Sequence, residues 1–327
     1  MKSATDVLTR SPRVIARTGT PEEQERTPRH LRLSERESAA AKTWLEEQTD
    51  AACCPLRTAG CVVLIREGAD GLEAFLTYRT SPDSPLGKVG FPGGAATAAD
   101  EQPVGWFGPT PTQWAQKFGH EEILPARCAV VAAIRETFQE VGVLLAGPDE
   151  TATVENSEAS ETMACRERIT GRELDFVDWL KRGGLKLRTD LLKPIGRWQS
   201  PNFSHRRYDT HYFAAVVPVG QKPRLLESRG VWGRWVTAAQ LVADLDSTAL
   251  GEEIGQEKTR GLTVQQLITP GVLCILESLA RSQSAIGFLT KKRTVHTQKP
   301  ELERRDGALT LCFTPPATGC APRAKGV

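Results

Sequence analysis

The chain has 327 residues, a formal net charge of +2 and 39% hydrophobic residues. This length permits one large domain or two ordinary ones with a substantial core, and the near-zero charge gives no reason to expect a nucleic-acid or membrane partner. The chain has eight scattered cysteines without a CxxC pair, and only five histidines. This pattern argues against a structural zinc site and is typical of reduced thiols.

Residues 1–33 are rich in Arg, Thr, Pro and Glu and show no apolar periodicity, so we expect this segment to lack fixed structure. It has no apolar stretch of the kind that forms a secretory signal. No run in the chain approaches the ~20 apolar residues that cross a bilayer. The sequence therefore predicts a cytoplasmic protein, and it leaves a homodimer open.

The first half of the chain alternates helical and strand-like segments. A helix is expected from the capping box of Ser34 and Glu37 to about residue 48. Strand-like runs follow at 60–67 and 73–79, and then a glycine-rich loop at 84–101. Residues near 101–124 look inserted and hold a short helix at about 112–118. The next helix is expected over 125–141, with Gly142 as its stop.

The second half continues this alternation. The polar residues near 148–169 are expected to form a flexible excursion, and Thr170 and Glu173 to open a short helix. Strand-like runs lie at 191–200, 211–219 and 231–236, before a helix at 263–281 that Pro270 interrupts. Residues 284–327 are expected to lack fixed structure. Mixed strands and helices without a clean linker predict one layered α/β domain over 34–283.

The helix at 125–141 carries a group of polar side chains on one face. Because residues at i, i+3 and i+4 share a face, Glu136, Gln139 and Glu140 project together, and Arg135 lies beside Gln139. Two carboxylates one turn apart can hold a hard cation such as Mg²⁺ that keeps several waters, and a Gln oxygen can coordinate without adding charge. The alternative is a solvated helix face with ordinary charge pairing.

This helix and the glycine-rich loop together resemble the Nudix box, GX5EX7REUXEEXGU, in which U is an apolar residue. The matching positions are Gly94, Asp100 and the run from Arg135 to Val143, and the run FPGG ends at Gly94. The resemblance covers roughly residues 56–280. It implies a Nudix-type α/β/α sandwich with a mixed sheet.

The chain departs from this pattern at several positions. Asp100 stands where Glu is usual, Gln139 replaces the first Glu of the EE pair, and Thr137 takes an apolar position. Between Asp100 and Arg135 lie 34 residues where the pattern has seven, so about 27 residues are inserted inside the box. This split box, with the later runs LLKPIGRWQSP and RRYDTHYFAA, resembles the branch of coenzyme A diphosphatase-like Nudix proteins.

The resemblance implies a hydrolase that cleaves the diphosphate bond of a nucleoside diphosphate derivative, with coenzyme A or acyl-CoA favoured. It implies a Mg²⁺ or Mn²⁺ cofactor held by Glu136 and Glu140, with Gln139 as a weak neutral ligand. Arg135 would complete the catalytic group by holding neighbouring acidic side chains in place. The partner would be a small nucleotide-type molecule.

Four further residues are expected to bind substrate: Arg79, Lys88, Gly93 and Gly94. The glycines let backbone approach phosphates, although a tight turn without ligand also explains them. The two cations can meet phosphate charge or lie solvated on strands.

Two points stay open in the sequence. The general base is not identified, and the candidates are Glu227, Glu252 and Glu253. The loss of one anionic ligand at Gln139 also permits a different class of protein, a Nudix-fold binding or regulatory module with little hydrolysis.

Overall fold

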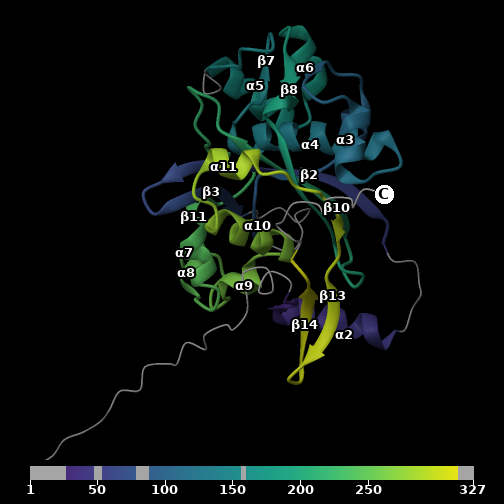
Figure 1. The fold of residues 1–327 in the computed structure, drawn as a ribbon, viewed down its shortest axis with the longest axis vertical. Helices are drawn as coiled ribbons and strands as arrows, with labels where there is room; N and C mark the ends of the chain where they lie inside the picture. The colour runs from purple at the N-terminus through teal and green to yellow at the C-terminus, as the bar shows by residue number, and fades with distance from the viewer. Residues whose placement is uncertain (1–26, 48–53, 79–87, 156–159, 316–327) are drawn as a thin grey trace, which may run out of the picture.

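A mixed sheet of eight strands forms the centre of the molecule (Figure 1). The computed structural model describes residues 27–47, 54–78, 88–155 and 160–315. The main strand order is β11 (Trp232–Thr237), β3 (Gly71–Tyr78), β2 (Leu56–Gly68), β10 (Arg207–Val216), β9 (Lys193–Gln199) and β12 (Thr297–Gln298). Two short strands, β4 (Val89–Gly90) and β5 (Gly93–Ala95), pair with β3 and β2. The β2–β10 and β9–β12 pairs are parallel.

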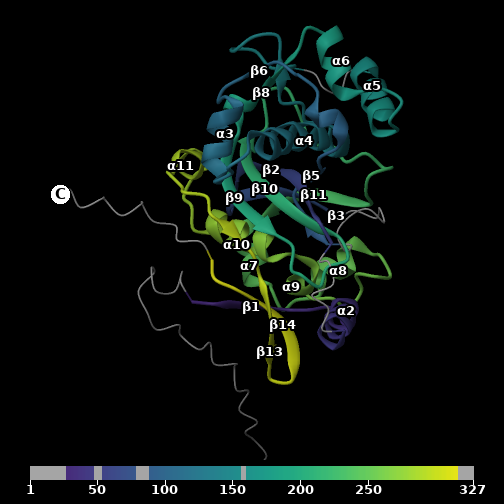
Figure 2. The ribbon, with the colours of Figure 1, turned by 90° about the vertical axis from the view of Figure 1, so that its right-hand side faces the viewer.

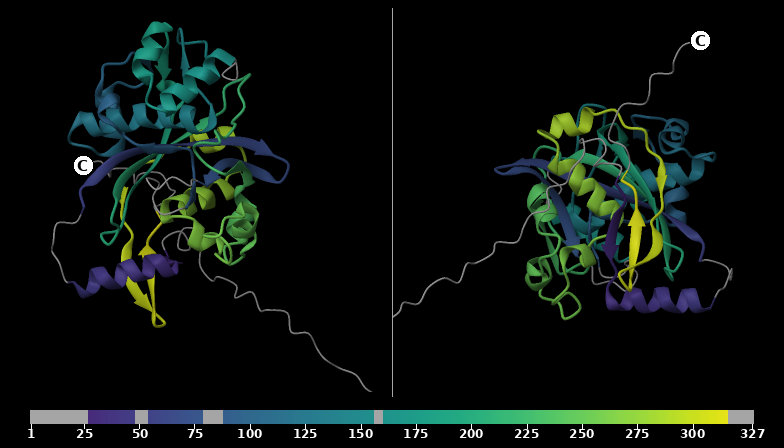
Figure 3. Two further views of the ribbon diagram at one scale, coloured as in Figure 1. Left: turned by 180° about the vertical axis from the view of Figure 1, so that it is seen from behind. Right: turned by 60° about the horizontal axis from the view of Figure 1, so that its bottom comes forward.

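Helices cover both faces of this sheet (Figures 1 and 3). On one side lie α3 (Pro111–Phe118), α4 (Ile123–Val141), α5 (Ser160–Thr170) and α6 (Phe176–Arg182). On the other lie α7 (Ala238–Ala243), α8 (Ala249–Ile254), α9 (Val264–Leu267) and α10 (Pro270–Ala280). Each side has its own apolar core. The predicted α/β/α sandwich with a mixed sheet is therefore confirmed.

The strand β2 explains why the sheet is covered twice. Its residues 62–65 are Val, Val, Leu and Ile, and all four are fully buried. A continuous apolar run is typical of a strand packed on both faces, because alternate side chains point to opposite sides. On the same strand Gly60 lets α4 approach closely, since a Cβ there would lie 2.1 Å from the Ala129 carbonyl oxygen.

Several predicted helix limits are confirmed. Ser34 caps α2 (Glu35–Glu46), with the capping box to Glu37 formed in both directions. Gly142 ends α4 in a left-handed conformation with φ of 75°, which costs glycine little. The break at Pro270 also occurs, because α9 ends at Leu267 and α10 starts at the proline.

The inserted residues near 101–124 are tied to the rest of the chain by a small sheet. Its strands are β6 (Trp106–Phe107), β8 (Lys186–Arg188) and β7 (Ala146–Gly147), in that order. The polar excursion at 148–169 is only partly irregular, since residues from Ser160 onward form α5. The helix expected at Thr170 instead begins at Phe176, because Asp175 is the residue that caps it.

The two terminal segments differ most from expectation. Residues 284–315, expected to lack fixed structure, form α11 (Ala285–Thr290), β12, β13 (Glu301–Arg305) and β14 (Ala308–Phe313). The strand β1 (Arg29–Arg32), from the other supposedly unstructured end, pairs with β14 (Figure 2). The reason is apolar alternation: Leu309, Leu311 and Phe313 are buried in the core. The rest of the N-terminal segment, 1–26, lies outside the described residues.

None of the helices in the described residues is long and apolar enough to cross a membrane. Their cysteines form no disulfide.

Candidate functional site

A cavity of about 430 Å³ opens where β5, β10, α4 and the start of α10 meet. This volume lies within the range of small-molecule sites, about 300–1,000 Å³. Among the described residues that line it, only Glu136 and Glu140 carry carboxylates. Glu227, Glu252 and Glu253, the candidates for a general base, do not line it. Glu253 instead binds the side chains of Trp232 and Arg234.

Glu140 is held by two fixed donors. The Thr77 hydroxyl donates to Oε1 over 2.8 Å, and the Gly93 backbone N–H donates to Oε2 over 3.0 Å. The side chain is buried, with 2% of the residue exposed. Hydrogen bonds from neutral donors orient a carboxylate without cancelling its charge. Glu140 can therefore present its negative charge to the cavity.

The glycine bend lies directly against the carboxylates. A Cβ on Gly94 would be 2.7 Å from Cδ of Glu136, a distance that real side chains do not adopt. Gly93 has a φ of +154°, and a Cβ there would lie 2.4 Å from the carbonyl oxygen of Gly60. Gly93 is therefore required by the close approach of backbone, whereas a side chain at Gly94 would displace the Glu136 carboxylate.

Arg135 does not line the cavity, but it binds Asp100 behind it and Glu136 on its wall. Its Nε and Nη2 donate to the two carboxylate oxygens of Asp100, each over 2.8 Å, and its Nη1 donates to Glu136 over 2.5 Å. Asp100 is fully buried. Desolvation lowers the pKa of Arg135, but the charges of Glu136 and Asp100 outweigh it and hold the pKa above its ordinary value. Arg135 thus joins Asp100, the early acidic residue of the box pattern, to α4.

Gln139 lies beside Glu136 but has its side chain turned to Arg135 and Arg229. Its Oε1 accepts from Arg135 over 2.8 Å and from Arg229 over 3.0 Å, and its Nε2 donates to the Ile169 carbonyl oxygen. Gln139 therefore shares Arg135 and Arg229 with Glu136 but, unlike the two glutamates, is not among the described residues that line the cavity.

Four cations line the cavity: Arg57, Lys88, Arg172 and Arg229. Of these, only Lys88 was expected from the sequence. Its Nζ donates to Glu37 and to the Gln266 carbonyl oxygen, so α2 and α9 hold it in place. Arg79, the other expected phosphate ligand, lies outside the described residues.

Arg172 and Arg229 come from segments far from the box in sequence. Arg172 follows α5 in a left-handed conformation with φ of 63°. Such a conformation is uncommon for a residue with a side chain and tends to occur at functional sites. Arg229 donates from Nη2 to Glu136 over 3.1 Å. Neither lies in a recognisable sequence pattern, and their spacing gives no signal.

The two glutamates fit a hard divalent cation. They lie one turn apart on α4 and line one cavity, and each ionised carboxylate can accept several bonds. Two carboxylates suit Mg²⁺ or Mn²⁺, which keep water in their remaining positions. Arg229 at present meets the charge of Glu136, so a cation there would share or replace this contact.

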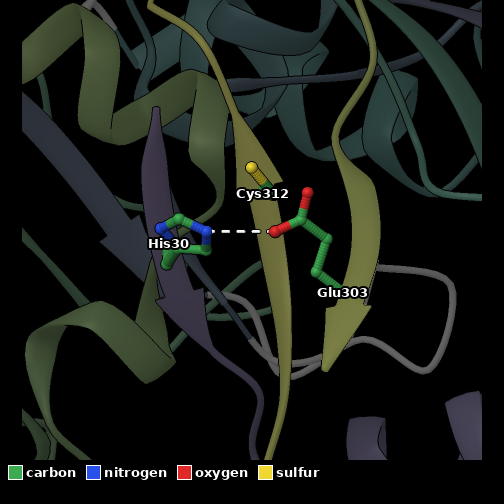
Figure 4. A group of neighbouring side chains, drawn as sticks. All are labelled: His30, Glu303 and Cys312. Atoms are coloured by element: carbon green, nitrogen blue, oxygen red, sulfur yellow. Dashed lines mark hydrogen bonds and ion pairs between the residues drawn. The ribbon is translucent and has the colours of Figure 1, made fainter. Parts of the chain in front are cut away.

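Two other clusters in the described residues group three potential metal ligands. The first, His30, Glu303 and Cys312, lies across β1, β14 and β13 (Figure 4). His30 Nε2 is 3.1 Å from Glu303, while Nη1 of Arg305 is 2.9 Å from its Nδ1. Because an arginine can only donate, Nδ1 accepts and the proton lies on Nε2. The cluster is therefore a cross-strand hydrogen-bond network. The His30 nitrogen that faces Glu303 carries a proton, so it has no lone pair to offer a metal there.

The second cluster is His120, Asp209 and His211, behind β10. His211 Nδ1 faces the carbonyl oxygens of Ala59 and Asp209 and therefore carries the proton. Nε2 of His211 lies only 2.6 Å from Nε2 of His120. Two imidazoles on one tetrahedral zinc stand about 3.3 Å apart. The closer approach indicates a direct hydrogen bond, in which the Nε2–H of His120 donates to Nε2 of His211.

Comparison with known proteins gives a structural likeness. No protein-family model matches the chain, and no curated protein matches it. A crystal structure of a NUDIX hydrolase from Alicyclobacillus acidocaldarius superposes with a TM-score of 0.52 at 24% identity, covering 73% of this chain and 98% of that one. A C. elegans Ap4A hydrolase binary complex covers 61% of this chain and 93% of that one, at 12% identity and a TM-score of 0.29. The first likeness shows that the chain has the Nudix fold.

Proposed function

We propose that this chain is a divalent-metal-dependent hydrolase that cleaves the diphosphate bond of a nucleoside diphosphate derivative, with coenzyme A or acyl-CoA as the favoured substrate. The observation that carries this proposal is the meeting of Glu136, Glu140 and the Gly93–Gly94 bend on one cavity wall. These are the acidic and glycine positions of the box, brought together from segments about 40 residues apart.

The charges of the cavity suit a diphosphate. Two carboxylates and a bound divalent cation would be close to neutral together, and Arg57, Arg172 and Arg229 add positive charge around them. A diphosphate diester carries two negative charges, which guanidinium groups bind well through paired hydrogen bonds. The site therefore favours an anionic ligand when the metal is present.

The reaction consumes one water. The water oxygen forms a bond to one phosphorus as the bridging P–O bond breaks, and the two protons of the water end on the two phosphate products. When bound, Mg²⁺ or Mn²⁺ supplies charge neutralisation and acidifies a water. Glu136 and Glu140 would hold this cation. They are also the only carboxylates among the described lining residues that can take a proton from the water.

The test is a panel of substrates with Mg²⁺ or Mn²⁺: coenzyme A, acyl-CoA, NADH, ADP-ribose and diadenosine phosphates. We expect metal-dependent products, with adenosine 3′,5′-diphosphate and a phosphopantetheine from coenzyme A. Glu140→Gln should lower turnover at least a hundredfold, whereas Glu121→Gln, an exposed acid just before α4, should not. Metal-dependent turnover of other diphosphates but not of coenzyme A would reject the favoured substrate alone.

A binding or regulatory module is the second candidate, and one contact favours it. Arg229 already pairs with Glu136, and Gln139 leaves the helix with one carboxylate fewer than the box pattern. Tight binding of a nucleotide without product, even at high Mn²⁺, would select the module. Faster turnover in Gln139→Glu would instead identify a weakened but active site.

A further inference from the structure

A second, smaller cavity adjoins the proposed catalytic cavity. We call it the apolar chamber, and its volume is about 120 Å³. The two cavities share five lining residues, Lys88, Tyr208, Thr210, Tyr212 and Thr269. Tyr208, Thr210 and Tyr212 alternate along β10 and so point to the same face of the sheet. A molecule that occupies the catalytic cavity can therefore reach the chamber along this strand.

Most of the exposed surface of the chamber wall is apolar, although Arg32, Glu37 and Arg206 also line it. Its inner apolar side chains come from β1, β9, β14 and the loop before β10, and they are Leu31, Trp198, Phe203 and Leu311. All four are buried. Trp198 is fixed by packing, since a Cβ on Gly271 would lie 2.9 Å from its ring and Phe313 meets it edge to face at 5.7 Å. Trp198 is thus a fixed part of the chamber wall.

The volume limits what can enter. An engineered apolar cavity of about 150 Å³ binds benzene, so a chamber of 120 Å³ suits a compact group of roughly four to six carbons. The shared residue Lys88 stands at the junction with its ammonium already held by Glu37. The Lys88–Glu37 ion pair therefore marks the junction between the polar cavity and the apolar chamber.

We propose that the apolar chamber is a specificity subsite that receives a compact branched or aromatic group joined to the diphosphate on the side away from the nucleoside. This inference rests on the proposed function and adds to it the chemistry of the second moiety. The mostly apolar wall favours hydrocarbon over a nucleobase, whose polar edge would lose hydrogen bonds to water there. Leu311 and Leu31 make the two terminal strands part of the substrate site.

The test uses adenosine diphosphate esters that differ only in the second alcohol: methyl, 2-methylpropyl, benzyl and n-decyl. Burial of each carbon is worth about fourfold in affinity, so KM should fall at least tenfold from methyl to 2-methylpropyl or benzyl, with little change in kcat. The decyl ester should gain no more than the branched one, because the chamber is short. Equal KM values for methyl and branched esters would overturn the inference.

A matched pair of variants assigns the effect to the chamber. Leu311→Phe fills it, so the ratio of methyl to 2-methylpropyl KM should fall towards one. Leu309→Phe adds the same atoms to a buried position of β14 that does not line the chamber, and it should keep the wild-type ratio. Phe203→Ala enlarges the chamber and should shift the preference to the benzyl ester, which tests the idea independently if Leu311→Phe does not fold.

The outcomes separate the two proposals. Hydrolysis of all esters with one KM sinks the subsite and leaves the proposed function standing. Turnover of coenzyme A but of none of the esters sinks the subsite alone, and no metal-dependent turnover of coenzyme A or of any ester sinks both.

Discussion

Asp100 and Arg135 form a buried ion pair that ties α4 to the segment after the glycine bend. Two guanidinium nitrogens bind the two carboxylate oxygens, and neither residue is more than 7% exposed. Removing one partner of a buried pair costs about 3–5 kcal/mol, and without Asp100 the buried Arg135 would keep its ion pair with Glu136 but lose two hydrogen bonds. The stability of the fold therefore depends less on the attraction within this pair than on the cost of a buried group that has lost its partner.

We predict that Asp100→Asn lowers the free energy of unfolding by about 3 kcal/mol or more. The matched control is Asp178→Asn, whose carboxylate pairs at 3.8 Å with Lys181 on the half-exposed face of α6. Exposed pairs contribute at most about 1 kcal/mol. Urea denaturation of both variants measures the difference. Equal effects would show that the Asp100–Arg135 pair does not stabilise the fold.

At the scale of single elements, the strand β5 sets the position of Glu136. We predict that Gly94→Ala lowers turnover at least tenfold, because the added methyl displaces the Glu136 carboxylate. Gly90→Ala in β4 is the control, since its Cβ would meet only a methyl of Val272 at 3.9 Å while lining the same cavity. Turnover per folded molecule, checked by circular dichroism, decides. Equal activity of the two variants would contradict the role of Gly94.

His211 on β10 contacts His120 of the inserted segment, and this contact depends on pH. Desolvation lowers the pKa of His211 to about 4, with Asp209 opposing and His120 and Arg197 supporting the shift. The unfolded chain takes up this proton near the ordinary pKa of about 6.5. Between these two values the unfolded state binds more protons, so stability is complete above pH 6.5 and falls as the pH drops towards 4.

We predict a loss of about 3 kcal/mol in unfolding free energy between pH 7 and pH 4 from this histidine. His211→Asn should flatten that part of the profile, because its amide can donate to the same carbonyl oxygens without titrating. His205→Asn, an exposed histidine, should leave the profile unchanged. Denaturant titrations at half-unit pH intervals provide the measurement. A wild-type slope in His211→Asn would place the pH dependence elsewhere.

At the scale of the whole molecule, the two ends of the chain complete one core. Phe313 on β14 is 4% exposed and meets Trp198 of the central sheet edge to face. We predict that Phe313→Ala costs about 3–5 kcal/mol, as for other buried phenylalanines. Cys312→Ala, on the opposite face of the same strand, should cost less than about 1 kcal/mol. Thermal unfolding distinguishes them, and no loss in Phe313→Ala would mean that the terminal strand does not stabilise the fold.

The sequence predicted the parts of the molecule whose signals are local. The capping box at Ser34, the stop at Gly142 and the Pro270 break each follow from a few neighbouring residues, and all three are confirmed. The box also predicted a helix and a glycine bend close together, because a known pattern links them. The Nudix fold could be predicted for the same reason.

Other features depend on contacts between distant segments and gave no local signal. Arg172 and Arg229 reach the cavity only because α5 and the loop before β11 fold over α4. The sequence of β13 is mostly charged, and it directly precedes the short apolar alternation of its partner β14. The charged residues therefore made the whole tail look unstructured. The position of Gln139 behind the cavity likewise depends on Arg229, 90 residues away.

The central claim is that Glu136 and Glu140 together hold one divalent cation, and calorimetric titration of Mn²⁺ into the protein tests it most directly. We predict one site in the wild type, at least tenfold weaker binding in Glu136→Gln and Glu140→Gln, and unchanged binding in Glu121→Gln. Wild-type affinity in both glutamate variants, with their folds intact, would contradict the account.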